Sequence, residues 1–326
     1  MKMTLWGARG SLPTPHSPVA VAERVRQGIE GFLAAGLNRP DQIAAYLASL
    51  PAHKLGGFGG NTPCVALQSA SGQSQVMIDG GSGLRLVGYD LMKGPCGKGQ
   101  GEAHIFFTHF HWDHLIGLPF FTPIFIPGNR IHVYAVQPEL ETVLRTVFRK
   151  PYFPLNFEQL GAKIEFHTLE PRKALRLGEF SLTPYQLDHP DPCWGYRVEA
   201  DGKVYSHCVD TEGTRTTREE LGADLPLYQG VDFMLYDAQY TLMEAIEKVN
   251  WGHAPATIGL DIAMREGIRK VLFMHHDPAS SDEKIAAAEH QARRYYEAQL
   301  RTARRNGDEI HEVDWRFARE GDVVEL

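Results

Sequence analysis

The chain has 326 residues, of which 43% are hydrophobic, so it could fold as one large domain or as two smaller ones. Its formal net charge of -7 gives no general basic surface, which argues against long nucleic acid as a partner, because Lys and Arg hold such ligands. No membrane span or signal peptide is expected, and four irregularly spaced cysteines suit buried thiols in a reducing cytoplasm better than a disulfide framework.

Three early segments each combine an apolar strand pattern with glycines: residues 3–13, 59–65 and 77–83. A glycine-rich turn lets backbone N–H groups approach a phosphate closely, although tight hairpin turns in a sandwich would give the same pattern. Asp79, in the third segment, could orient a metal-binding histidine or cap its own turn. The residues alone leave both interpretations open.

Between the first two of these segments lies a helical insertion at about residues 15–55. Residues 19–33 carry apolar side chains at helical spacing and Gly36 provides a stop, while residues 41–50 predict a second short helix. The insertion could cover an active-site mouth, select substrate, form a homodimer contact or serve the fold alone. The sequence does not decide among these roles.

The densest group of chemically active residues follows an apolar run at 104–107 that predicts a buried strand. Three histidines and an aspartate occupy the six positions 109–114. His109 and His111 would point the same way, whereas Asp113 and His114 would come from the following turn and point to a neighbouring position. This spacing predicts two adjacent metal ions; the alternative is a chance gathering of histidines in a polar surface loop.

The pattern His-x-His-x-Asp-His resembles the signature of the metallo-β-lactamase superfamily of dinuclear hydrolases. That resemblance requires further ligands at the ends of later strands, and matching segments are present. They are His189 before a strand pattern at 194–198, Asp210 after one that begins at 204, and His275 with His276 after one at 271–274. The family position favours His275 over His276, because successive strand residues face opposite ways. Cys208 shares a face with Asp210 by the same rule and stays an alternative ligand.

The resemblance implies a complete dinuclear centre. His109, His111 and His189 would bind one ion, Asp113, His114 and His275 would bind the other, and Asp210 would bridge them with a water. Zinc suits this imidazole-rich set, while manganese and iron stay open because mixed nitrogen and carboxylate shells bind several first-row metals.

A second motif points to one branch of the superfamily. Residues 250–257 contain Gly252-His253-Ala254, a helix pattern follows at 258–265, and the strand that ends at His275 comes next. This order resembles the phosphodiesterase branch that includes the tRNA-maturing endonucleases. The three glycine-containing segments at 3–13, 59–65 and 77–83 resemble its cyclic-nucleotide-phosphodiesterase-like group. The resemblance implies that His253 contacts the scissile phosphate; a capping or core histidine is the alternative. Ala254 departs from the Ser or Thr that family members usually show.

The fold expected from the order of strands and helices is α+β. Two mixed sheets would pack face to face, with helices at 138–147, 254–267 and 283–301 outside them, as a four-layer αββα sandwich. The proposed ligands extend from His109 to His275 with no Pro/Ser-rich linker between them. We therefore expect a single domain over residues 1–326.

The main functional hypothesis is a dinuclear metal-dependent phosphodiesterase that acts on a small phosphodiester such as a cyclic nucleotide. Asp113, which would orient the attacking water, and His253 are the expected catalytic residues. The same metals would also permit hydrolysis of a carboxylic ester, thioester or lactone. A metal-containing sensor or binding protein without turnover, and redox chemistry with iron, are the further alternatives.

Overall fold

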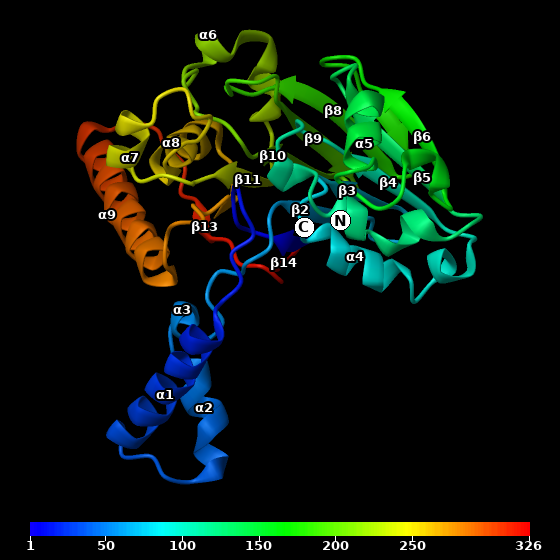
Figure 1. Ribbon diagram of the computed structural model, residues 1–326. Helices are drawn as coiled ribbons and strands as arrows, with labels where there is room; N and C mark the ends of the chain where they lie inside the picture. Colours follow the sequence, from blue (N-terminus) through cyan, green and yellow to red (C-terminus); the bar gives the residue numbers. More distant parts are fainter.

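The computed structural model describes residues 1–326 apart from the side chain of Ala52. Its strands form two sheets of seven that pack face to face (Figure 1). The first sheet has the order β14 (Val323–Glu325), β1 (Lys2–Gly7), β2 (Cys64–Gln68), β3 (Gln75–Ile78), β4 (Glu102–Phe106), β5 (Arg130–Ala135) and β6 (Lys163–Thr168). The second has the order β13 (Asp314–Phe317), β12 (Lys270–Met274), β11 (Phe233–Asp237), β10 (Lys203–Cys208), β9 (Trp194–Ala200), β8 (Phe180–Gln186) and β7 (Leu175–Leu177).

Three buried clusters define the layers. The central cluster joins the facing sides of the two sheets, for example Phe106 and Leu235. A second cluster packs the outer face of the first sheet against α4 (Leu84–Leu91) and α5 (Leu140–Val147). The third packs the second sheet against α8 (Ala256–Glu266) and α9 (Asp282–Asn306). This arrangement confirms the expected four-layer sandwich.

Helix boundaries differ from the sequence expectations by a few residues. Pro255 is the extended N-cap of α8, with φ -82° and ψ 152°, so the helix begins at Ala256 rather than at residue 254. Ser281 caps α9 by accepting a hydrogen bond from Lys284 N, and the helix continues to Asn306, well beyond residue 301. The short helices α6 (Arg218–Leu221) and α7 (Leu242–Glu247) complete this side of the molecule.

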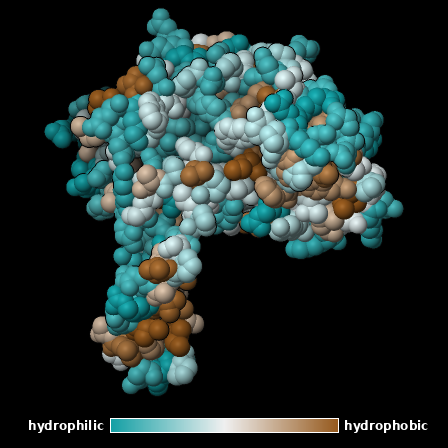
Figure 2. All heavy atoms as spheres, in the orientation of Figure 1, coloured by the Kyte–Doolittle hydropathy of each residue, from teal (hydrophilic) through white to brown (hydrophobic). Residues whose placement is uncertain are grey.

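The insertion forms a helical arm that extends from the body (Figure 1). It contains α1 (Pro18–Ala34), α2 (Ile43–Ser49) and α3 (Ala52–Leu55). The described residues of α1 and α2 include no buried one, and hydrophobic side chains gather on the arm surface (Figure 2). The predicted helices are therefore present, while the role of the arm stays open. No helix among the described residues is both long enough and apolar enough to cross a membrane.

The direction of the strands determines where the loops meet. Strands β3 to β6 run parallel, as do β10 to β13. The carboxyl ends of parallel strands lie at one edge of a sheet, so the segments that follow β4, β10, β11 and β12 can converge. These are the segments in which the sequence places most of its candidate ligands.

A buried ion pair anchors the arm and the first loop to α9. The carboxylate of Asp282 accepts a hydrogen bond from Arg9 at 3.1 Å and another from Phe58 N at 3.1 Å, and it also pairs with Arg24 of α1. The Arg9 side chain is 4% exposed and that of Asp282 is 1% exposed. Loss of the carboxylate would therefore leave a buried guanidinium without its partner.

We expect Asp282→Ala to lower the free energy of unfolding by about 3 kcal/mol or more, the usual scale for an uncompensated buried charge. Urea denaturation of the full chain measures this change. Glu283→Ala is the matched control, because the side chain of Glu283 is 59% exposed and its pair with Lys54 is long, at 3.7 Å. Equal stabilities of the two variants would contradict the structural importance of the Asp282 pair.

Candidate metal centre

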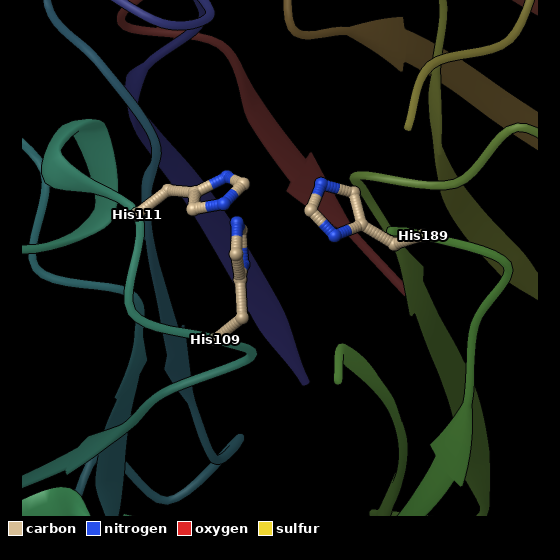
Figure 3. A group of neighbouring side chains, drawn as sticks. All are labelled: His109, His111 and His189. Atoms are coloured by element: carbon tan, nitrogen blue, oxygen red, sulfur yellow. The ribbon is translucent and has the colours of Figure 1, made fainter. Parts of the chain in front are cut away.

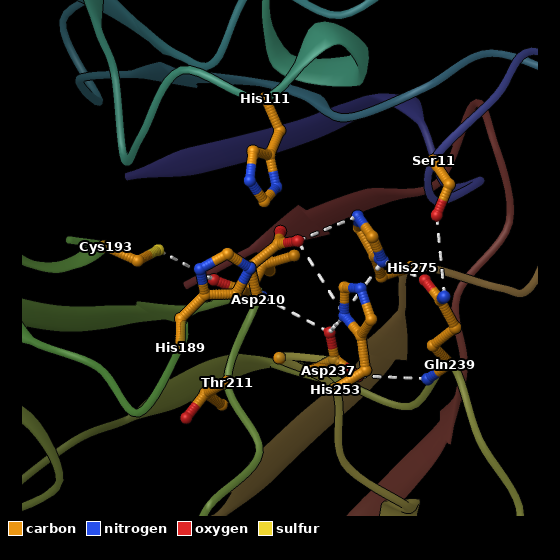
Figure 4. A network of polar contacts seen from close by, with 12 residues as sticks. Ser11, His111, His189, Cys193, Asp210, Thr211, Asp237, Gln239, His253 and His275 are labelled. Atoms are coloured by element: carbon orange, nitrogen blue, oxygen red, sulfur yellow. Dashed lines mark hydrogen bonds and ion pairs between the residues drawn. The ribbon is translucent and has the colours of Figure 1, made fainter. Parts of the chain in front are cut away.

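Loops from both sheets converge on one group of histidines and aspartates. His109 and His111 follow β4, and Asp113 and His114 lie in the short 3-10 helix η3 (Trp112–His114). From the second sheet come His189 after β8, Asp210 after β10, His253 before α8 and His275 after β12 (Figure 4). The structure thus brings together the seven residues of the expected dinuclear centre and His253, whereas the alternative ligands Cys208 and His276 lie outside it.

The first subgroup contains three histidines. The ligand atoms of His109, His111 and His189 lie within 4.8 Å of one another, and their rings face a common space (Figure 3). Ring centroids are 4.5 Å apart for His109 and His111 and 4.8 Å apart for His109 and His189. Two of the rings come from the first sheet and one from the second, so the packing of the two sheets closes this subgroup.

The second subgroup shares Asp210 with the first. Asp113 Oδ2 lies 3.4 Å from His114 Nε2 and 3.2 Å from His275 Nε2. Asp210 Oδ2 lies 3.1 Å from His114 Nε2, and Asp210 Oδ1 lies 3.2 Å from His275 Nε2 and 4.0 Å from His109 Nε2. The Asp210 carboxylate therefore stands between the two subgroups.

Unpaired buried atoms show that this donor set fits metal ions. Within the described chain, four inward atoms have no hydrogen-bond partner of acceptable geometry: His109 Nε2, His114 Nε2, His189 Nε2 and Asp210 Oδ2. Each such buried atom costs about 1–3 kcal/mol if it stays unsatisfied. A metal ion accepts lone pairs from imidazole nitrogen and carboxylate oxygen, so ion binding would remove this cost at several atoms together.

Charge interactions within the cluster are strong. Burial opposes protonation of His275, but Asp210 and Asp113 raise its pKa to about 9. Burial likewise opposes protonation of His114, and Asp210 with Asp79 raises its pKa well above the usual range. Burial would raise the pKa of Asp210, yet His275 and His114 hold it well below normal. The buried carboxylates thus require nearby positive charge, which protons or metal ions can supply.

A second layer of contacts orients the histidines. Asp79 Oδ2 lies 2.9 Å from His114 Nδ1, an ion-pair contact without hydrogen-bond geometry, and the carboxylate accepts a hydrogen bond from Thr108 N at 2.9 Å. Gln239 Oε1 lies 2.6 Å from His275 Nδ1. Of the two roles left open for Asp79, the structure therefore shows the contact with a candidate ligand. Such partners fix the tautomer and direction of a metal-binding ring.

Backbone strain accompanies this geometry. Asp79, Asp210 and His275 all have positive φ values, at 64°, 63° and 67°. Side chains other than glycine rarely adopt this conformation, which costs of order 1 kcal/mol or more at each position. The three residues are the ones that turn a strand end toward the centre, so the strain is tied to their placement.

The structure separates His275 from His276. His275 lies against Asp113 and Asp210, whereas His276 Nε2 lies 2.8 Å from the carbonyl of Ala318 and its ring stacks on Phe317. The predicted strand register is therefore the one observed. Cys208 lies in the helix-side core with Sγ 3.1 Å from Ser206 Oγ. The positive φ of Asp210 ends the strand alternation from which Cys208 was considered as a ligand.

Two contributors were not predicted. Asp237 ends β11, and its Oδ2 lies 3.0 Å from His253 Nδ1 (Figure 4). Another possible ligand group consists of Asp210, Asp237, His253 and His275. Gln239 follows two residues later. The signal for Asp237 was the apolar run Phe-Met-Leu-Tyr before an aspartate, the same pattern that identified the other strand ends.

The comparisons with known proteins agree with this geometry. A family model described as the beta-lactamase superfamily domain matches residues 75–276, which include every candidate ligand. The chain belongs to this superfamily. The recognition made from the sequence motifs is thereby confirmed.

Similar proteins include enzymes named for phosphorus chemistry. Ribonuclease BN of Cronobacter sakazakii is 29% identical over 154 residues, which cover 44% of this chain and 45% of that protein. Ribonuclease Z of Staphylococcus carnosus is 29% identical over 139 residues, which cover 39% and 40%. The matched segment spans less than half the length of these relatives.

Among solved structures, a crystal structure of a diphosphatase from the PhnP family is similar, with a TM-score of 0.59 at 18% sequence identity. The similarity covers 100% of this chain and 97% of that chain, and it supports the fold.

We expect His275→Ala to reduce the transition-metal content per chain and His276→Ala to leave it unchanged. The reason is that only His275 lies among the other candidate ligands, while His276 is held by a carbonyl on the far side of the strand. Elemental analysis of both variants, with wild-type protein prepared in parallel, measures the difference. Equal metal loss in both variants would remove the distinction between the two histidines.

Proposed function

We propose that the protein is a dinuclear metal-dependent phosphodiesterase that acts on a small phosphodiester. One observation carries the proposal: Asp210 stands between two histidine-rich subgroups whose buried lone pairs lack partners. The ribonuclease names of its relatives support phosphodiester chemistry. The four cysteines are free and buried, which supports a reducing cytoplasmic location.

The ligand assignment follows the two subgroups. His109, His111 and His189 would hold one ion, Asp113, His114 and His275 the second, and Asp210 would touch both. Zinc is the first choice because most donors are imidazole nitrogens. When bound, two such ions would lower the pKa of a water molecule toward neutrality and would polarise the oxygens of the substrate phosphate.

The chain's own residues would position the reactants. Asp113 Oδ2 accepts a hydrogen bond from Ser11 N at 2.7 Å, which fixes one oxygen of the carboxylate. The carboxylate can then orient an attacking water toward phosphorus. The water would release one proton to solvent. As its oxygen bonds to phosphorus, the bond from phosphorus to the leaving oxygen breaks, and the leaving oxygen must receive a proton.

His253 and Asp237 are suited to supply that proton. His253 Nδ1 lies 3.0 Å from Asp237 Oδ2, so the aspartate can hold the ring in one orientation. Protonated His253 would donate from Nε2 to the leaving oxygen. A buried aspartate behind a histidine plays this orienting role in other hydrolases.

The structure also accounts for the departure at Ala254. Its backbone N–H donates to Asp237 Oδ1 at 3.1 Å, and Gln239 N donates to the same oxygen at 3.0 Å. The residue after His253 thus supports Asp237 through its main-chain N–H, which every residue type except proline can provide. The missing hydroxyl leaves this contact intact.

We expect His253→Ala to retain the metal content while lowering phosphodiester turnover by roughly a hundredfold or more, the usual scale for a lost proton donor or charge-stabilising group. Asp237→Asn should retain the position of His253 but shift the pH profile of kcat. The measurements are elemental analysis and steady-state kinetics. Unchanged turnover of His253→Ala on a phosphodiester, with activity on thioesters or lactones, would favour the acyl-hydrolase alternative.

The substrate proposal rests on charge, and the names of the relatives make RNA the main competitor. A net charge of -7 disfavours a long polyanion, and we expect higher kcat/KM for cyclic nucleotides and bis-p-nitrophenyl phosphate than for RNA 3′ ends. A competition assay with zinc or manganese at physiological ionic strength measures the ratio. A higher kcat/KM for RNA would overturn the small-substrate proposal but would leave the proposed phosphodiesterase activity in place.

A further inference from the structure

A second cluster of histidines lies in the first sheet, away from the centre described above. It occupies β4, β5 and β6, which lie side by side (Figure 1). The parallel register pairs His104 with His132 and Tyr134 with His167. Because β4 ends at Phe106 and the candidate metal centre begins after Thr108, four residue steps of about 13 Å in extended chain lie between His104 and Thr108.

The cluster contains a compact set of donors. Ligand atoms of Glu102, His104 and His132 lie within 4.8 Å of one another. The rings of His104 and His132 stack with centroids 4.7 Å apart and an interplanar angle of 15°. The rings of His132 and His167 stack at 5.3 Å. Three imidazoles and a carboxylate thus come together from three neighbouring strands, with Glu102 and His104 on β4, His132 on β5 and His167 on β6.

The decisive atom is His132 Nε2. His132 is 7% exposed, and Nε2 is buried without a hydrogen-bond partner among the described residues. The nearest carboxylate oxygen, Glu102 Oε1, is 3.9 Å away, too far for a hydrogen bond. His132 Nδ1 lies 3.1 Å from His167 Nε2. If Nδ1 donates there, Nε2 carries a free lone pair, and Glu102 Oε1 is a neighbouring donor atom at 3.9 Å.

Burial favours the neutral form of His104 and His167. Burial, followed by the proximity of His132, lowers the pKa of His104 to about 4. Burial also lowers the pKa of His167. Both rings are then neutral near pH 7, and a neutral imidazole is the form that coordinates a metal ion.

We propose that Glu102, His104 and His132 form an additional binding site for a transition-metal ion, with His167 adjacent to His132. Two imidazoles and one carboxylate are a donor set that suits zinc. The three donors would draw closer on binding, since a tetrahedral zinc site has ligand distances of about 2.0–2.2 Å. An ion here would link β4 to β5 at the end of the sheet opposite the candidate metal centre.

Arg130 is the main competitor for this site. Its Nη1 lies 3.1 Å from Glu102 Oε1 and its Nη2 lies 3.1 Å from Glu165 Oε1. The Glu102 side chain is 51% exposed, so its pair with Arg130 is a surface pair that contributes little and can exchange. Removal of Arg130 should therefore strengthen metal binding, an effect opposite to that of removing a ligand.

The experiment measures zinc bound per chain by the metal-loaded full-length protein after equilibrium dialysis at set free zinc concentrations. Wild-type protein should bind one equivalent beyond those of the candidate metal centre, and the ion should raise Tm. His132→Gln and Glu102→Gln should each lose this equivalent or weaken it at least tenfold. Turnover should be unchanged, because neither residue belongs to the catalytic machinery. Glu102→Gln alters an exposed side chain, so it keeps the test informative if His132→Gln unfolds.

Two further variants sharpen the result. His290→Gln with His311→Gln removes two exposed histidines and should leave the additional equivalent unchanged. Arg130→Gln should bind it at least threefold more tightly. The proposal is overturned if wild-type protein lacks the additional equivalent, if Glu102→Gln retains it at full affinity, or if Arg130→Gln weakens it. The readout is independent of the proposed phosphodiesterase activity, so either proposal can fail alone.

Discussion

Burial of the Asp210 carboxylate is the constraint on which the site depends. A charged carboxylate that is 2% exposed requires positive charge around it, and His109, His114 and His275 surround it within 4.0 Å. Those histidines come from two different sheets, so the sandwich must close for the charge to be satisfied. Cation binding and packing of the two sheets are therefore coupled, and loss of the ions should weaken the contact between the layers.

The strand ends convert this requirement into geometry. Because β10, β11 and β12 are parallel, their carboxyl ends lie at one edge of the second sheet, and the packing of the sheets places the end of β4 nearby. Positive φ at Asp210 and His275 turns these two side chains toward the shared space. Contacts from Asp79 and Gln239 then fix His114 and His275. Stable strands and strained turns are thus both needed, because the strain is tolerated only where the surrounding sheet holds the backbone.

Local patterns in the sequence predicted most of the fold and the candidate ligands. His109 to His114 are close in sequence and form a motif, and the resemblance of that motif to the superfamily signature then implied His189, Asp210 and His275. Asp237 ends the apolar run of β11. The sequence analysis did not select it because one aspartate at a strand end is common, and only the 3.0 Å contact with His253 distinguishes it. The ligand roles themselves stay predictions.

The cluster of His104, His132 and His167 shows what local patterns cannot reveal. Its members are about thirty residues apart in sequence, and each sits in a strand whose alternation explains it as an ordinary inward residue. Only the register between β4, β5 and β6 stacks the rings, and only the surrounding packing leaves His132 Nε2 without a partner. Donor atoms on adjacent strands come close together only through strand pairing, and the register of that pairing is a property of the sheet rather than of any one segment.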